Sequence, residues 1–440
     1  MDDYAHSQYL QVFHLLQDHH KWFSESLPLI ASENVPSLAV REALISDFGN
    51  RYAEGWPGER VYAGCRFIDQ VELMCIDLAK RLFRAEFADV RPVSGVCANL
   101  TVYTAFTEPG DVMLALAIPN GGHISMGRRD FWGTAGKVHG LDVDYFEFDR
   151  EEMNVDVDRS LRKIKDLEGK GRAPKLATFG GSLFLFPHPV KELAEAIHSA
   201  GGRVAFDAAH VSGLIGAGEF QDPLREGADA MMMSSHKTLF GPQGGAVLSF
   251  ERFAEDIKKS TFPANTSNHH LHSVAGKAVA FCEMLRFGQE YGRQVIANAK
   301  ALAQALSDQG MHVLGEKRGF TESHQVAVNV TRFGLGGDIE RRLEEANIIV
   351  NRQLLPGDIK AGRHYQNPGG IRIGTSEVTR LGMHESEMKL VAELVSKVIK
   401  GESLDAIRTE VAELRRDFQE LHYCFGSGQR AYDYIELMKK

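Results

Sequence analysis

A lysine stands at the end of an apolar run in MMMSSHKTLFGPQGG, residues 231–245. Burial lowers the pKa of a lysine amine, and an amine without its proton can form a Schiff base with a carbonyl compound. The glycines and the proline after Lys237 allow the backbone to turn sharply. Lys237 is therefore a candidate covalent anchor; the alternative is a lysine that only extends its ammonium group from a strand end into solvent.

An aspartate ends a second apolar run, RVAFD at 203–207. A carboxylate in that position costs free energy unless it has a partner. One suitable partner is the protonated pyridine nitrogen of a cofactor that accepts electrons. His210, three residues later, could face the same site. The alternative for Asp207 is a helix N-cap, which is common where a strand leads into a helix.

Three further motifs contain residues that suit a charged or aromatic ligand. Ser94 and Gly95 precede an apolar helical run, and the free N–H groups of a helix start can bind phosphate. His123 follows paired glycines and could stand over a ring, and the guanidinium of Arg372 could bind a carboxylate. Taken singly, each motif also fits a structural role. Ser94-Gly95 could be a common helix start, His123 a hydrogen-bonded polar residue, and Arg372 a member of a structural ion pair.

Two N-terminal stretches, 29–37 and 50–64, are rich in polar and aromatic residues and lack periodicity. We interpret them as ordered functional loops, in which Tyr52, Glu54 and Tyr62 could transfer protons. Surface loops without such a function are the alternative.

The elements that must position these residues alternate between helix and strand. The predicted elements are a helix at 190–202 and strands at 111–118, 176–180, 203–207, 228–234 and 244–250. This alternation predicts an α/β fold with a mostly parallel sheet, in which ligands bind outside the carboxyl ends of the strands. Asp207 and Lys237 both fall at such ends, so one crevice could hold both. Beyond about residue 290 a smaller α+β domain is predicted, with helices at 294–310 and 385–400, strands at 324–330 and 347–351, and a loop at 352–370.

The composition is that of an ordinary globular protein of 440 residues, with 43% apolar and 25% charged residues. A net charge of -9 argues against a nucleic-acid or anionic-membrane surface. The sequence contains neither a signal-like segment nor an apolar run of the roughly 18 residues that a membrane span needs. Its five scattered cysteines form no CxxC pair, which favours reduced thiols in a cytoplasmic protein over disulfides or a zinc site. We expect no metal.

Taken together and in order, LIASEN, NRYAEGWPGERVYAG, GGH, FDAAHVSGLI, SSHKT with GPQGG, and GGIRIGT resemble the serine hydroxymethyltransferase family from about residue 10 to 400. GGSLFLFPHP and GFTESHQVAV look most like its archaeal-type branch. The resemblance implies the aspartate-aminotransferase-like fold type I of enzymes that use pyridoxal 5'-phosphate (PLP). It also implies an N-terminal arm and dimer-contacting segment at 1–60, a large PLP-binding domain at 61–288 and a small C-terminal domain at 289–440.

The resemblance implies roles in binding the cofactor. Lys237 would hold PLP as a Schiff base, Asp207 would keep its pyridine nitrogen protonated, and His123 would stack on its ring. The other cofactor contacts would be Ser94, Gly95, Val96 and Ser234 at the phosphate, and Ser182 and His210 at the ring oxygen.

The resemblance also implies substrate and carrier contacts. The substrate would bind Ser32, Tyr52, Glu54, Tyr62, His210 and Arg372, with Arg372 and Ser32 at its carboxylate. Tyr52, Glu54 and Tyr62 would come from a neighbouring subunit, which implies a homodimer with shared active sites. The carrier would contact Gly122, His123 and Ile124.

The implied reaction interconverts L-serine and glycine and transfers a one-carbon unit to tetrahydromethanopterin or tetrahydrofolate. The sequence departs from the family pattern at Val96, at Gln243, at Ser267-Asn268 and in the loop 353–368. These departures leave the PLP chemistry intact and bear on the carrier. The alternative function is a PLP-dependent aldolase or transaldolase of β-hydroxy-α-amino acids of the threonine or α-methylserine type; the presence of Tyr52, Glu54 and Tyr62 favours the transferase.

Overall fold

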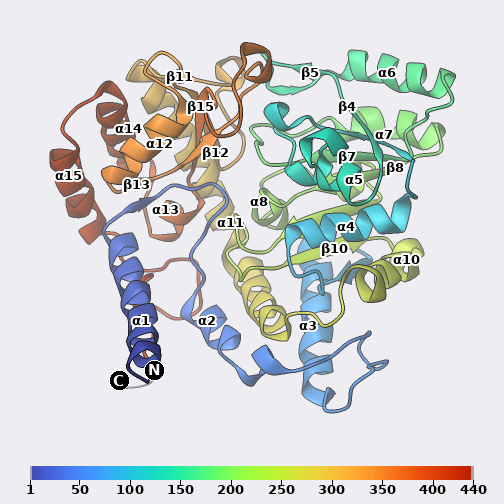
Figure 1. Cartoon of the computed structure of the whole chain (residues 1–440), viewed down its shortest axis with the longest axis horizontal. Helices are drawn as coiled ribbons and strands as arrows, with labels where there is room; N and C mark the ends of the chain where they lie inside the picture. Colours follow the sequence, from blue (N-terminus) through green and yellow to red (C-terminus); the bar gives the residue numbers. More distant parts are fainter. Residues whose placement is uncertain (1, 438–440) are drawn as a thin grey trace.

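The computed structural model describes residues 2–437. Among these residues, a seven-stranded sheet with helices on both faces forms the larger part of the molecule (Figure 1). In spatial order its strands are β2 (Phe87–Asp89), β10 (Gly245–Ser249), β9 (Ala230–Ser234), β8 (Arg203–Asp207), β7 (Leu176–Gly180), β3 (Val112–Ala115) and β4 (Asp142–Tyr145). β10 runs antiparallel to both neighbours, and the remaining pairings of this sheet are parallel. The predicted α/β class with a mostly parallel sheet is confirmed.

Apart from the edge strand β4, the strands of this sheet are short, mostly apolar and buried on both faces. Along β8, Val204 and Phe206 pack into one core and Ala205 packs into the other, as the alternation of side chains along a strand requires. The helices that contribute to the first core include α3 (Arg66–Phe83), α7 (Val190–Ser199) and α11 (Leu271–Asp308). Those that contribute to the second include α4 (Gly95–Phe106) and α10 (Ala254–Lys259). Two covered faces leave the carboxyl ends of the parallel strands as the accessible edge.

The C-terminal part forms the smaller α+β layer. Its antiparallel sheet contains β11 (His312–Val313), β12 (Gln325–Asn329), β15 (Gly370–Gly374) and β14 (Asn351–Gln353), in that order. The helices α12 (Gly336–Glu345), α14 (Glu385–Lys400) and α15 (Leu404–Arg416) pack with this sheet around a separate core. Residue 288, proposed above as the last residue of the large domain, lies inside α11, which contributes to both cores.

The helix predicted at 294–310 is longer than expected, because α11 begins at Leu271. Glycines inside the helix, Gly276 and Gly292 among them, interrupt the apolar pattern. A Cβ at Gly276 would lie 3.0 Å from Pro242, and one at Gly292 would lie 2.9 Å from Ala217. These glycines therefore let neighbouring segments pack closely against a continuous helix.

The strand predicted at 347–351 is two strands. β13 (Ile348–Ile349) pairs in parallel with β1 (Leu27–Pro28), whereas β14 pairs with β15. The two strands are distinct because each pairs with a different segment. This division depends on tertiary contacts, so the local sequence pattern does not reveal it.

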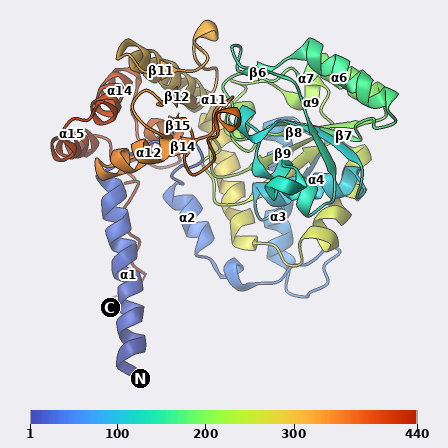
Figure 2. The same ribbon diagram turned by 45° about the horizontal axis from the view of Figure 1, so that its top comes forward.

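The N-terminal helix α1 (Asp2–Ser24) extends away from the body of the molecule (Figure 2). It is followed by α2 (Leu38–Leu44) and by a segment at 51–65 without regular structure, as predicted for 50–64. No helix within residues 2–437 combines the length and the apolar composition needed to cross a membrane.

A buried ion pair joins distant parts of the chain. Arg380, at the end of α13 (Ser376–Arg380), donates from Nη2 to Oε2 of Glu283 in α11 at 3.2 Å, and both side chains are fully buried. The guanidinium also donates to the carbonyl oxygens of Val35 and Tyr423 and lies 3.7 Å from the ring centroid of Phe240. The Arg380 guanidinium thus contacts three distant segments: the N-terminal segment, the loop after Lys237 and the C-terminal tail.

Glu283→Ala is expected to lower the free energy of unfolding by roughly 3–5 kcal/mol, because it leaves the Arg380 charge buried without a counter-ion. Urea denaturation followed by circular dichroism measures this change. Lys300→Ala, at an exposed position of α11, is the control and should stay within about 0.5 kcal/mol of the parent. A loss no larger than that of the control would contradict the role given to the ion pair.

Candidate active site

A cavity of about 190 Å³ lies beyond the carboxyl ends of the central strands. The predicted residues that line it are Ser94, Gly95, Val96, His123, Asp207, Ser234 and Lys237. Residues not predicted from the sequence also line it, namely Asn99, Gly181, Ala209, His236 and Gln243. The start of α4 and the ends of β7, β8 and β9 thus meet at the edge of the sheet where a ligand was expected.

The backbone around Lys237 is held in place by hydrogen bonds. Asn34 donates from Nδ2 to the carbonyl oxygen of Lys237 at 2.6 Å. Thr238 donates from Oγ1 to the carbonyl oxygen of His210 at 2.8 Å. A Cβ at Gly213 would come within 2.2 Å of the Thr238 carbonyl carbon, so glycine is what lets α8 (Ser212–Gly216) approach this segment. The side chain of Lys237 is left facing the cavity.

The surroundings of Lys237 favour the neutral amine. Burial lowers the pKa of Lys237 to about 8; the Asp207 carboxylate opposes this shift, and the Arg372 cation adds to it. At pH 7 about a tenth of such an amine is unprotonated, against well under one per cent for an ordinary lysine. A nucleophilic amine needs this property.

Asp207 is anchored by a hydrogen-bond network that contains two residues not predicted from the sequence. Its Oδ1 accepts from the N–H of Ala209 at 3.0 Å, and its Oδ2 accepts from Nδ2 of Asn99 at 2.8 Å. The same Asn99 Nδ2 donates to Oγ of Ser125 at 2.8 Å, and Ser125 Oγ lies 2.8 Å from Nδ1 of His123. Asn99 lies about one helical turn after the start of α4, and that spacing could have revealed it.

The network also sets the protonation of His123. Its Nδ1 accepts from the N–H of Ser125 at 3.1 Å, so the neutral ring carries its proton on Nε2. Burial lowers the pKa of His123, and the Asp207 carboxylate only partly opposes this shift. A neutral, flat ring can stack on an aromatic ligand without adding a positive charge.

The start of α4 forms a cradle for an anion. Ser94 Oγ accepts from the N–H of Cys97 at 3.2 Å, while the N–H groups of Gly95 and Val96 have no partner among residues 2–437. A Cβ at Gly95 would lie 2.4 Å from Oγ of Ser234, so this glycine lets the hydroxyl approach the helix. Free N–H groups, two hydroxyls and the positive end of a helix together suit a phosphate.

A polar cluster surrounds Arg372 of β15. Its Nη1 donates to the carbonyl oxygen of Ser182, and its Nε donates to Oδ1 of Asn351 at 3.2 Å. Gln325, which the sequence did not single out, donates from Nε2 to Nδ1 of His210 at 2.8 Å. Burial lowers the pKa of Arg372 to about 10, which leaves the guanidinium charged at neutral pH. An oriented, charged guanidinium is what carboxylate binding requires.

Four predicted residues, Ser32, Ser182, His210 and Arg372, do not line the lysine cavity. The last three belong to the Arg372 cluster just described. Ser32 follows Ala31, whose carbonyl oxygen accepts from Nε2 of His324 at 3.1 Å, and His324 stacks on His210 with centroids 5.6 Å apart. Ser32 is thereby tied to the same cluster through its neighbour.

Tyr52, Glu54 and Tyr62 also lie outside the cavity of their own chain. The tyrosine rings have centroids 5.1 Å apart, and each ring is about half exposed. Ser267 donates from Oγ to Oε1 of Glu54 at 2.5 Å, and Asn268 hydrogen-bonds twice to the backbone of the loop. The loop is therefore held in one arrangement, and its polar groups are presented at the surface of the chain.

A larger, apolar cavity of about 640 Å³ adjoins the segment that carries His123. Its lining residues are Ala117, Ile118, Pro119, Ile124, Phe131, Tyr145, Leu354, Ile359, His364 and Tyr365. Of the predicted carrier contacts, Ile124 lines this cavity, His123 lines the lysine cavity, and Gly122 lines neither. A Cβ at Gly122 would come within 2.0 Å of the Leu116 carbonyl oxygen, so Gly122 allows a tight backbone approach.

The lysine cavity fits PLP. It offers an amine of lowered pKa to the aldehyde, a carboxylate fixed by two N–H donors to the pyridinium nitrogen, and unpartnered helix N–H groups to the phosphate. Within residues 2–437, no group of three or more His, Cys, Asp and Glu side chains is arranged to hold a metal ion.

Comparison with known proteins places these features in a family. Residues 6–395 match the family model of serine hydroxymethyltransferase. The chain is 62% identical over 435 residues to a serine hydroxymethyltransferase of Cenarchaeum symbiosum, with 98% of each chain covered. It is 60% identical to that of Nitrosopumilus maritimus, again with 98% of each covered, and 51% identical to that of Methanocaldococcus jannaschii, with 93% and 94% covered.

The pKa of Lys237 predicts how the protein without cofactor takes up PLP. Because only the neutral amine reacts, the rate of covalent uptake should rise with pH to about 8 and level off above it. Arg372→Met removes a charge that lowers this pKa and should shift the midpoint upward, whereas Asp207→Asn should shift it downward. Stopped-flow absorbance of bound PLP measures the rate. A parent midpoint near the ordinary lysine value would show that burial does not activate this amine.

Proposed function

Because the chain belongs to the serine hydroxymethyltransferase family, whose members are PLP-dependent enzymes of fold type I, we propose that the Lys237 cavity interconverts L-serine and glycine and passes the one-carbon unit to tetrahydromethanopterin. The observation that carries this proposal is the meeting of Lys237, Asp207 and the free N–H groups of α4 in one cavity. An apolar cavity next to it offers room for the ring system of a reduced pterin.

When bound, PLP supplies an aldehyde that joins to amines and a ring that withdraws electrons from the substrate. Lys237 would hold its aldehyde end, and Asp207, oriented by Asn99, would keep a proton on the ring nitrogen. His123 would lie against the ring. The residues proposed for the phosphate are Ser94, Gly95, Val96 and Ser234, and those for the ring oxygen are Ser182 and His210.

Arg372 and Ser32 would bind the carboxylate of the amino acid. Nε and Nη1 of Arg372 are committed to Asn351 and Ser182, whereas Nη2 has no hydrogen bond within residues 2–437. Fixing two nitrogens orients the guanidinium and leaves the third for a substrate oxygen.

A second copy of the chain would complete the site. Tyr52, Glu54 and Tyr62 lie outside the cavity of their own chain on a loop held by Ser267 and Asn268. In a homodimer with shared active sites, Glu54 and the two tyrosines would hold and move the proton of the serine hydroxyl in the neighbouring cavity.

The apolar cavity favours tetrahydromethanopterin over tetrahydrofolate. Both carriers join a reduced pterin to an arylamine, but tetrahydromethanopterin has additional methyl groups close to the reacting nitrogens. Leu354, Ile359 and Tyr365 of the loop 352–370 line the cavity beside Ile124. Each methyl group buried there would contribute about 0.8 kcal/mol.

Glycine formation from L-serine by the purified protein tests the carrier directly. Parallel reactions contain tetrahydromethanopterin, tetrahydrofolate or no carrier, and we expect the highest kcat/KM with tetrahydromethanopterin. Higher kcat/KM with tetrahydrofolate would make folate the carrier. Turnover of serine that ignores both carriers would favour an aldolase or transaldolase instead.

Mixing two inactive variants tests the shared site. Lys237→Ala and Glu54→Gln should each lose most activity, because each removes a group from a different side of the same site. If subunits exchange freely, half of the dimers are mixed and each mixed dimer has one intact site of two, so about a quarter of the parent activity should return. Absence of any recovery, with exchange verified by native mass spectrometry, would show that both groups act within one chain.

A further inference from the structure

A third cavity, of about 730 Å³, lies beside the apolar one. Asn120 and Lys360 line it, and their sequence neighbours Pro119 and Ile359 line the apolar cavity. The same two chain segments therefore form walls of both cavities. A ligand seated in the apolar cavity would find the third cavity at one end.

Some charged side chains around this third cavity have partners of opposite charge or hydrogen-bond partners, and others have none. Of its acidic residues, Glu147 pairs with Lys163 at 3.4 Å, and Asp149 accepts backbone N–H groups of the turn that follows it. Arg159 is held by Asp156 at 2.6 Å. In contrast, the exposed side chains of Arg150 and Lys360 make no ion pair or hydrogen bond within residues 2–437. Two cations from different segments are thus left unmatched in one cavity.

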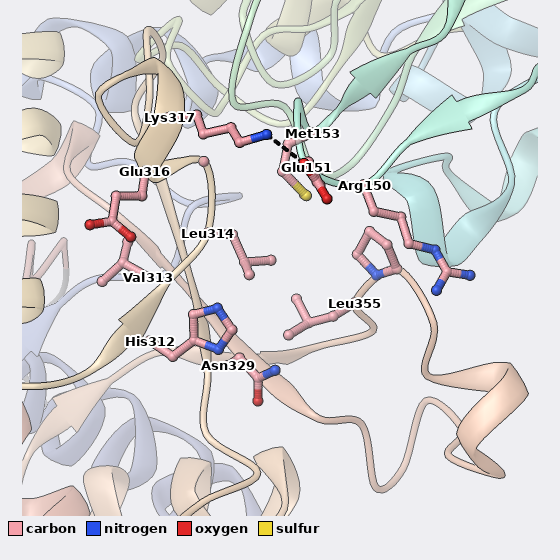
Figure 3. Close-up of a pocket in the computed structure, with 12 residues that line it drawn as sticks. Arg150, Glu151, Met153, His312, Val313, Leu314, Glu316, Lys317, Asn329 and Leu355 are labelled. Atoms are coloured by element: carbon pink, nitrogen blue, oxygen red, sulfur yellow. Dashed lines mark hydrogen bonds and ion pairs between the residues drawn. The ribbon is translucent and has the colours of Figure 1, made fainter.

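A neighbouring cation, Lys317, is already paired. Figure 3 shows a further cavity, of about 350 Å³, that shares Arg150 and Glu151 with the third one. Lys317 is engaged there in an ion pair with Glu151, and the Arg150 side chain points away from that pair. Arg150 and Lys360 therefore remain as the cations available to a ligand.

We infer that this third cavity binds the anionic tail of the one-carbon carrier, an inference that rests on the function proposed above. Both candidate carriers attach an anionic tail to the arylamine: glutamate carboxylates in tetrahydrofolate, a phosphodiester and carboxylates in tetrahydromethanopterin. With the rings in the apolar cavity, the tail extends past Asn120 and Ile359 to Arg150 and Lys360. Arg150 offers a planar fork to phosphate or carboxylate, and Lys360 offers a second positive charge.

Binding and kinetics of carriers with and without a tail test this site. Isothermal titration calorimetry gives the Kd, and initial rates give the KM, for tetrahydromethanopterin and for a synthetic form that ends at the arylamine. A second pair compares tetrahydrofolate with one and with several glutamates. We expect Lys360→Ala and Arg150→Ala each to raise Kd and KM of the tailed forms by about two- to fivefold, as for exposed ion pairs, and to leave the tail-less form unchanged.

Salt and a matched variant provide the controls. Raising the ionic strength should weaken binding of the tailed carrier by the parent more than by a variant that carries both Arg150→Ala and Lys360→Ala, because salt screens the two charges that this variant lacks. Lys300→Ala removes an exposed cation of α11 that makes no ion pair within residues 2–437 and lines none of the four cavities described, so it should change neither constant.

The outcomes separate this site from the function on which it rests. A loss confined to the tetrahydromethanopterin pair would assign the cations to its phosphodiester tail, and a loss confined to the folate pair would assign them to glutamates. Equal losses for tailed and tail-less carriers, losses matched by Lys300→Ala, or no loss would overturn the tail site while carrier-dependent glycine formation continued. Glycine formation independent of every carrier would overturn the proposed function itself.

Discussion

The cost of burying charge is the constraint on which this active site depends. Lys237 and Asp207 come together because β8 and β9 are parallel neighbours and release the chain at the same edge of the sheet. Arg372 arrives from the smaller sheet. Burial alone would make each charge unfavourable, but the Asp207 carboxylate offsets part of that cost at Lys237. The balance leaves Lys237 with a pKa of about 8 and Arg372 charged, so the reactivity of the amine belongs to the arrangement and not to the lysine alone.

That arrangement requires the larger and the smaller part of the molecule to keep a fixed position relative to each other. α11 packs into both cores, and the buried pair of Glu283 and Arg380 ties it to the helix that follows β15. The N-terminal segment contributes from a third direction, since β1 pairs with β13 and Asn34 holds the carbonyl oxygen of Lys237. Segments separated by hundreds of residues thereby fix the positions of a few polar atoms.

The contacts of the residues that depart from the family pattern explain what these residues do. Val96 offers its backbone N–H to the anion cradle, so the departure at Val96 keeps a donor there although the side chain has no hydroxyl. At the departure Ser267-Asn268, Ser267 donates to Glu54 and Asn268 hydrogen-bonds to the backbone of the same loop. These two side chains organise the loop proposed to serve a neighbouring subunit. The loop 352–370 supplies apolar walls, and Lys360 stands where two cavities meet.

The sequence by itself determined the parts of the protein that depend on local chemistry. β8 and α14 have the predicted bounds. Asp207 ends β8, Ser94-Gly95 begins α4 and Lys237 follows the end of β9 by three residues, because apolar runs and glycines mark those ends. Only the tertiary structure decided the rest. The hydrogen bonds of Asn99 and Ser125, the Gln325 contact with His210 and the division of 347–351 between two sheets all join residues distant along the chain. Local patterns specify where a strand ends, whereas the partner that meets it there is set by packing, which no spacing along one segment can encode.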